Sequence, residues 1–307
     1  MTQASEVAVS LRGVTKTFGA HTAVDRLSLT VPRGSVYGFI GPNGSGKTTT
    51  LRMIMHILHP DSGEVEVLGR RTLRAANDRV GYLPEERGLY KAMTVRDVLR
   101  FYAELKGLRQ SRSAIDGWLS RMGLADWAGK KVQALSKGMA QKVQFIAAVV
   151  ASPELVLLDE PFSGLDPVNL EVIREAVLDL RRDGTTVIFS THDMNVAERM
   201  CDSIFMIYRG QKVLDGTLES IQAVYGSDTL RVRLNSDGLV SDLPGVQKLT
   251  DFGRYQELRL AQGVDSQGVL SALMARGRVL HFELARPSLH DIFVRIAAPE
   301  AGENHHA

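Results

Sequence analysis

Apolar residues over the first 60 positions repeat with a spacing that changes along the chain. Alternating Val and Leu predict strands at Val7–Val14 and Leu27–Val31, and the apolar run Ser35–Ile40 predicts a third strand. Residues Thr48–Leu58 then contain no Pro or Gly and carry apolar side chains at helical spacing. The pattern therefore predicts a strand, a glycine-rich turn and a helix, in that order.

The middle of the chain has a different amino-acid composition. Residues 86–150 are rich in Leu, Ala, Arg and Lys, which predicts a group of helices. Strand patterns return at Leu155–Leu158, Thr185–Phe189 and Ser203–Ile207, and Val168–Arg182 has a helical apolar face. Strands that are separated by helices are typical of an α/β sheet.

After Gly226 the pattern changes to short alternating segments, which predict half-buried antiparallel strands and two helices. We expect a first domain at residues 7–225, with a helical subdomain at about 86–150, and a small α+β domain at 226–298. Residues 299–307 are expected to be disordered. The predicted strands lie around Leu230–Leu234, Leu258–Leu260 and Leu280–Leu284, and the predicted helices at Ser266–Arg276 and Ser288–Ile296.

Composition narrows the possible functions. The chain has 37 Lys and Arg against 35 Asp and Glu, so it lacks the basic excess expected of a nucleic-acid binder. Cys201 is the only cysteine, which excludes internal disulfides and fits a reducing cytosol. The start of the chain lacks the pattern of a signal peptide, and no apolar run approaches the roughly 20 residues of a bilayer span. We therefore expect a cytoplasmic protein that meets a membrane only through a partner.

A phosphate-loop pattern lies between the predicted third strand and the helix that follows it. In such a loop the backbone N–H groups surround the phosphates, and Lys47 would place its charge on the β and γ phosphates. Thr48 would bind Mg²⁺ through its hydroxyl. ATP and Mg²⁺ are therefore the expected cofactors, and a flexible glycine turn is the alternative. The expected nucleotide-binding residues here are Gly41, Pro42, Asn43, Gly44, Ser45, Gly46, Lys47, Thr48 and Thr49.

Two adjacent carboxylates follow the buried strand at Leu155–Leu158. Asp159 is expected to hold Mg²⁺, and Glu160 to orient and deprotonate the water that attacks the γ-phosphate. His192 follows another predicted strand and could reach the γ-phosphate, because the carboxyl ends of parallel strands gather at one edge of a sheet. The alternatives are a solvated Asp-Glu pair and a structural histidine.

The order of these motifs resembles the ATP-binding cassette (ABC) family over about Val7–Thr217. Leu135–Gln141 looks like the family signature, and Ser163–Asp166 looks like the loop that links the sites of two subunits. Ser190–Asp193 looks like the switch-histidine segment. The resemblance implies a phosphate-loop NTPase cassette, which is an α/β fold with a mixed sheet and a helical subdomain.

The family resemblance also implies partners. In a head-to-tail dimer, Ser136 and Gly138 of one subunit would cover the ATP on the phosphate loop of the other, and Asp166 would cross the interface. The second subunit would be another copy of this chain or a related one. Phe18 sits where the family stacks an aromatic ring on adenine. Transmembrane permease subunits would hold the dimer at the cytoplasmic face of the cell membrane.

Three residues depart from the family pattern. Lys137 and Met139 stand in the signature where the family usually has glycine and glutamine. Glu85 replaces a glutamine in Gly81–Glu85, the segment that resembles the loop sensing magnesium and the permease, so Glu85 would add a carboxylate near the metal.

The segments Gly81–Tyr90 and Pro287–Phe293 resemble a bacterial branch typified by sodium-efflux ATPases, in which exporters dominate. The expected function is therefore ATP hydrolysis that drives a membrane exporter. The alternative is a cassette ATPase that acts on the ribosome or DNA, although the chain has neither a second cassette nor long heptad repeats. For the last domain, contacts with partners and the sensing of a small ligand both remain open.

Overall fold

The computed structural model describes residues 6–71, 77–86, 88–225, 229–235, 243–261 and 263–297. The chain divides into two compact units, Met1–Leu218 and Glu219–Ala307, each with a hydrophobic core of its own. The tail expected to be disordered, residues 299–307, lies outside the described residues.

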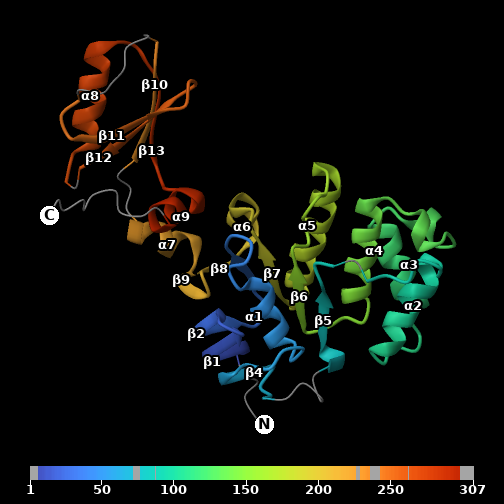
Figure 1. Ribbon diagram of the computed structural model, residues 1–307. Coiled ribbons are helices and arrows are strands. Elements are labelled where there is room, and N and C mark those ends of the chain that lie inside the picture. The colour runs from blue at the N-terminus through green and yellow to red at the C-terminus, as the bar shows by residue number, and fades with distance from the viewer. Residues whose placement is uncertain are drawn as a thin grey trace. The chain divides into compact units, whose positions relative to one another are not determined.

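Two sheets form the first unit (Figure 1). A three-stranded antiparallel sheet contains β2 (His21–Pro32), β1 (Val7–Phe18) and β4 (Ser62–Val67), in that order. A six-stranded sheet is parallel except for its last pair, and is therefore mixed. Its order is β5 (Val80–Leu83), β6 (Leu155–Asp159), β7 (Thr186–Thr191), β3 (Val36–Ile40), β8 (Ser203–Tyr208) and β9 (Gln211–Gly216).

Alternating residues of strand β6 pack into two separate hydrophobic cores. Val156 and Leu158 belong to the cluster formed with the helices that follow β5, whereas Leu155 and Leu157 belong to the cluster shared with the three-stranded sheet. Because both faces of β6 are covered, its sequence is continuously apolar. The helices are α1 (Lys47–Ile54), α2 (Val95–Leu105), α3 (Arg112–Arg121), α4 (Lys137–Val149), α5 (Pro167–Arg182) and α6 (Met194–Met200), with 3₁₀ turns at Asn77–Arg79, Ala125–Trp127 and Val132–Ala134.

The first helix is shorter than the sequence predicts. The apolar spacing extends to Leu58, but α1 ends at Ile54. His56 adopts a left-handed backbone conformation with φ of 51°, which a continuing helix does not allow. The chain then turns to enter β4.

The topology of the larger sheet places three loops side by side. Strands β6, β7 and β3 are adjacent and parallel, so their carboxyl ends lie at one edge. The segments that follow them contain Asp159 and Glu160, His192, and the phosphate loop. This edge is where ligands bind in sheets of this kind.

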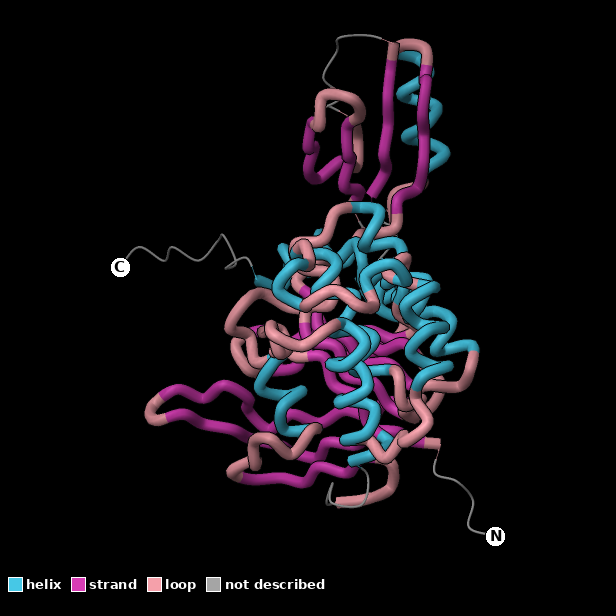
Figure 2. Tube along the Cα trace, turned by 90° about the vertical axis from the view of Figure 1, so that its right-hand side faces the viewer, coloured by secondary structure: helices cyan, strands magenta, loops and turns pink. Residues whose placement is uncertain are grey.

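The second unit is built on a four-stranded antiparallel sheet in the order β11-β12-β10-β13. Helix α8 lies alongside these strands (Figure 2), and its Val269 and Leu273 join the apolar core. The apolar face predicted for β13 is only partly buried. Phe282 packs on this core, whereas Leu280 and Leu284 are 45% and 47% exposed. The elements are α7 (Leu218–Tyr225), β10 (Thr229–Leu234), β11 (Val246–Asp251), β12 (Gln256–Leu260), α8 (Ser266–Arg276), β13 (Val279–Ala285) and α9 (Leu289–Ala297).

Within the described ranges, every helix is too short or too polar to cross a lipid bilayer.

Candidate functional site

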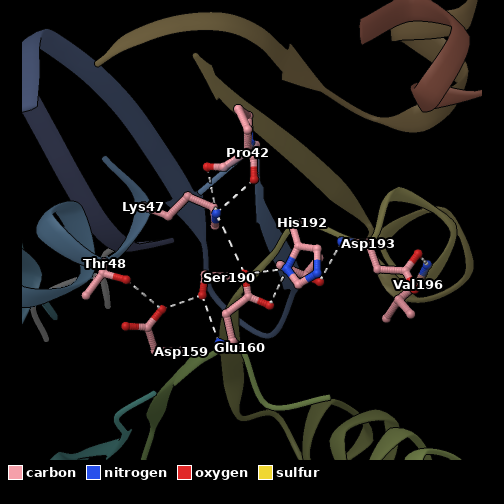
Figure 3. Close-up of polar contacts among 11 residues, drawn as sticks. Pro42, Lys47, Thr48, Asp159, Glu160, Ser190, His192, Asp193 and Val196 are labelled. Carbon is pink, nitrogen blue, oxygen red and sulfur yellow. Dashed lines mark hydrogen bonds and ion pairs between the residues drawn. The ribbon is translucent and has the colours of Figure 1, made fainter. Parts of the chain in front are cut away.

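The phosphate loop connects the end of β3 to the first residue of α1. Gly46 has φ of 111°, and a β-carbon there would lie 2.5 Å from the carbonyl oxygen of Ala23, so only glycine fits. Lys47, the first residue of the helix, donates from Nζ to the carbonyl oxygens of Gly41 at 2.8 Å and Pro42 at 3.1 Å (Figure 3). Its ammonium group is therefore held over the loop that would surround the phosphates.

Asp159 is fully buried at the end of β6. Its Oδ1 accepts hydrogen bonds from the hydroxyls of Thr48 at 3.1 Å and Ser190 at 2.5 Å. Its Oδ2 has no hydrogen-bond partner among the described residues, although it too is buried. A buried, unpaired carboxylate oxygen is costly and indicates a position where a cation would be stabilised.

Glu160 lies between two nitrogen groups. Its carboxylate is 3.7 Å from Nζ of Lys47, and Nδ1 of His192 lies 3.1 Å from each carboxylate oxygen (Figure 3). The backbone of Glu160 is left-handed, with φ of 49°, which is a strained conformation for a residue with a side chain. Such strain is typical of functional sites whose surroundings fix the conformation.

The charge of Lys47 is balanced within the site. Burial lowers the pKa of Lys47, because water is removed from the ammonium group. The carboxylates of Glu160, Asp159 and Glu85 oppose this shift. The lysine is therefore partly desolvated yet faces three carboxylates, and an incoming phosphate would compete with Glu160 for it.

The open side of the loop forms a pocket of about 460 Å³. Phe18 lies at this pocket with 48% of its surface exposed, and Lys16 places its Nζ 5.6 Å from the centre of the ring. Gln144 fixes the segment that contains Glu85 by donating to the carbonyl oxygens of Pro84 and Glu86. The pocket is lined by Phe18, His21, Ala23, Asn43, Gly44, Gly46, Lys47, Thr48, Thr49, Glu85 and Glu160.

The signature and linking-loop residues form a second group, which does not line this pocket. Ser136 caps α4 by accepting from the N–H of Met139, and Asp166 caps α5 by accepting from the N–H of Asn169. The side chain of Asn169 also lies against Gly138, where a β-carbon would be 3.1 Å from Nδ2. Ser136, Gly138 and Asp166 therefore lie at the N-termini of α4 and α5, which contact each other through Gly138 and Asn169.

Comparison with known proteins agrees with this geometry. Residues 24–163 match the family model described as ABC transporter, and residues 216–297 match that of the DrrA1-3-like C-terminal domain of ATP-binding proteins. An ABC transporter ATP-binding protein of Bacillus subtilis, YhaQ, is 41% identical over 92% of this chain and 95% of its own length. The chain belongs to the ATP-binding subunits of ABC transporters.

Two further relatives support the assignment. The Nod factor export ATP-binding protein I of Paraburkholderia xenovorans is 33% identical over 96% of this chain and 98% of its own length. A solved ATP-binding subunit of an ABC transporter superposes with a TM-score of 0.67 at 29% identity, covering 71% of this chain and 93% of that one. The predicted fold, the family and the ABC transporter ATPase activity are thereby confirmed, and this ATP-binding subunit binds ATP.

Three residues of the site are not predicted by the sequence pattern. Ser190 is predicted only as part of the switch-histidine segment, yet its hydroxyl contacts both Asp159 and Glu160. His21 lines the pocket, and Gln144 fixes the segment around Glu85. A signal for Ser190 exists in the sheet register, where it lies opposite Asp159.

Proposed function

We propose that this ATP-binding subunit hydrolyses ATP by general-base catalysis at Glu160 and thereby drives the export of a substrate through membrane permease subunits. The observation that carries the catalytic part is the position of the Glu160 carboxylate, between Nζ of Lys47 and Nδ1 of His192. Lys47 would bind the β and γ phosphates, while Glu160 orients a water molecule and accepts its proton as oxygen attacks the γ-phosphorus.

His192 is suited to a role beside the base. Its ring nitrogen contacts both oxygens of Glu160, which restrains the direction of the carboxylate. The histidine side chain is 55% exposed, so its other nitrogen remains open to a phosphate oxygen. We infer that His192 aligns Glu160 and contacts the γ-phosphate of bound ATP.

The donor set at Asp159 fits Mg²⁺. Its Oδ2 is buried without a partner among the described residues, and the Thr48 hydroxyl contacts its Oδ1. Magnesium prefers a few protein oxygens completed by phosphates and water, so the lack of a cluster of three or more His, Cys, Asp or Glu within the described ranges does not oppose it. Thr48 and Asp159 would hold the ion, and Glu85 would add a nearby carboxylate. When bound, the ion would neutralise charge on the phosphates.

The separation of the two residue groups supports a dimer. Lys47 lies in the pocket, whereas Ser136 and Gly138 lie outside it in the same chain. We propose that a second copy of the chain supplies these signature residues to the phosphate loop, with Asp166 at the interface. A related subunit in place of the second copy is the alternative, and stoichiometry in the purified complex distinguishes the two. Nucleic acid is not a proposed partner.

Export and the permease partner are proposed from relatives. A protein that matches nearly the full length of this chain is described as a Nod factor export protein. Of the apolar residues near the start of α2, Tyr90 is 53% exposed and packs its ring edge-on against Phe101, while Leu89 and Met93 pack on the core. Tyr90 is therefore the residue we assign to contact with a permease at the cytoplasmic face of the membrane.

Purification from membranes tests this proposal. The tagged chain is extracted in mild detergent, and the proteins that accompany it are identified by mass spectrometry, with the Tyr90→Ala variant in parallel. We expect a polytopic membrane protein in near-equal amount that raises ATPase activity, and less of it with the variant. Recovery of ribosomal or DNA-bound partners alone would overturn the transport role and leave the ATPase assignment intact.

A further inference from the structure

A cleft lies on the face of the second unit's sheet opposite the apolar core that contains α8. Residues 229, 231, 257 and 259 line it, whereas the alternate residues Leu230 and Leu258 are fully buried in that core. The cleft has a volume of about 320 Å³, which is at the lower end of the range for small-molecule sites. Its charged lining consists of Arg231, Lys248, Glu257, Arg259, Arg286, His290, Asp291 and Arg295.

Two cations face each other directly across the floor of this cleft. Lys248 on β11 pairs in register with Arg259 on β12, and Arg259 pairs in turn with Thr229 on β10. The same row continues to Ala285 on β13, and Arg286 follows it in the chain. The side chains of both Lys248 and Arg259 would attract an anion in the cleft.

The two carboxylates of the cleft already accept hydrogen bonds. Glu257 accepts from Nε of Arg231 at 2.8 Å. Asp291 accepts from the backbone N–H and the hydroxyl of Ser288, at the start of α9. Glu257 thus neutralises one cation of the same lining, and the cleft still has five Lys or Arg side chains against two carboxylates. The resulting field favours a negatively charged ligand.

We propose that this cleft binds a small phosphate ester, with Lys248, Arg259 and Arg286 as the residues that contact its oxyanion. Four of the five cationic side chains are arginine, whose planar guanidinium group matches phosphate oxygens in a bidentate fashion. The volume accommodates a small ligand and not a folded partner. All lining residues belong to the second unit, so the site is independent of the phosphate loop.

A calorimetric titration tests the proposal on the full chain. The protein is first saturated with a non-hydrolysable ATP analogue and Mg²⁺, so that the phosphate loop is filled before inorganic phosphate or glycerol 3-phosphate is added. We expect one further site per chain with a Kd of about 1 mM or tighter. The Lys248→Ala/Arg286→Ala double variant should weaken binding at least about tenfold, because it removes two charge-assisted contacts. Both residues are exposed, so the variant is expected to fold.

The matched control is Arg278→Ala, an exposed arginine of the same unit that does not line the cleft, and its affinity should equal that of the parent. Vesicles of phosphatidylcholine with and without phosphatidylglycerol distinguish the source of the phosphate. Binding that requires the anionic vesicles assigns the cleft to a lipid headgroup, and binding to soluble glycerol 3-phosphate assigns it to a free metabolite. No binding of either form, or equal binding by the double variant, would overturn the proposal. These outcomes concern only the cleft and leave the proposed role of Glu160 in ATP hydrolysis untouched.

Discussion

The hydroxyl of Ser190 donates a hydrogen bond to Oδ1 of Asp159 at a distance of 2.5 Å. The Ser190 hydroxyl oxygen also accepts a hydrogen bond from the backbone N–H of Glu160 at 2.9 Å, so one serine contacts both carboxylate residues. This arrangement follows from the sheet, since Ser190 on β7 lies in register with Asp159 on β6. The strained backbone of Glu160 is thereby tied to a rigid strand.

Replacement of this serine should affect catalysis more than binding. In Ser190→Ala, the N–H of Glu160 and Oδ1 of Asp159 lose a partner, so both carboxylates shift. We expect kcat to fall about tenfold or more while the KM for ATP changes less than about threefold. Steady-state ATPase assays measure both constants. The control is Ser203→Ala, a serine at the amino end of β8; a similar fall in that variant would argue against a specific role for Ser190.

Removal of the loop lysine should weaken nucleotide binding itself. The partly desolvated ammonium group of Lys47 is held over the loop, where a phosphate of bound ATP would accept its hydrogen bonds. For Lys47→Ala we expect the affinity for ATP to fall at least about tenfold, as measured with a fluorescent ATP analogue. The exposed Lys130→Ala serves as control. An unchanged affinity in Lys47→Ala would contradict the assignment of this side chain to the phosphates.

The carboxylate of Asp61 should make the free energy of unfolding depend on pH in the acidic range. Hydrogen bonds from Nζ of Lys16 and from Thr17 lower the pKa of Asp61 from 3.8 to about 2. Because the folded-state pKa is the lower one, the contribution is fully present above about pH 4 and is lost as the pH falls through about 2. In urea unfolding, Asp61→Asn should be less stable than the parent at neutral pH, and the difference should shrink below pH 4. A difference independent of pH would contradict this.

Helix α4 and strand β5 approach closely at Gly81, and a Gly81→Ala substitution tests this contact. At Gly81 an added β-carbon would lie 2.1 Å from the carbonyl oxygen of Ala148, so the helix would have to move. We expect Gly81→Ala to lower the free energy of unfolding by about 2 kcal/mol or more. At Gly117 in α3 the same change meets no atom within 4 Å, so Gly117→Ala should be neutral or slightly stabilising. Equal effects on unfolding would refute the packing explanation.

The sequence predicted the elements that carry strong local patterns. Strands β3, β6, β7 and β8 each contain an apolar run that is buried because both faces of the sheet are covered, and α8 has the predicted bounds. Strands β4, β5, β9 and β11 were not predicted. Of these, β4 begins with three exposed residues, β5 has only four residues, and β9 is half exposed, so their pairing depends on distant partners and not on local pattern.

The candidate site shows the same limit. Lys47, Asp159 and Glu160 could be predicted because each stands in a short motif directly after a strand. The contact of Ser190 with Asp159 depends on the register between two strands, and a histidine 32 residues away meets Glu160 only after the sheet has formed. The basic cleft combines residues of four strands and a helix, none of which is unusual by itself.

The Glu160→Gln variant distinguishes the proposed role of Glu160 as the base for ATP hydrolysis from a role in nucleotide binding. Glutamine keeps the size of the side chain and leaves Lys47, Thr48 and Asp159 in place, but it cannot accept the proton of water. In parallel assays, ATP affinity should stay within about threefold of the parent, hydrolysis should fall at least about 100-fold, and size-exclusion chromatography with ATP should show a dimer. Turnover near that of the parent would contradict the assignment of Glu160 as the base.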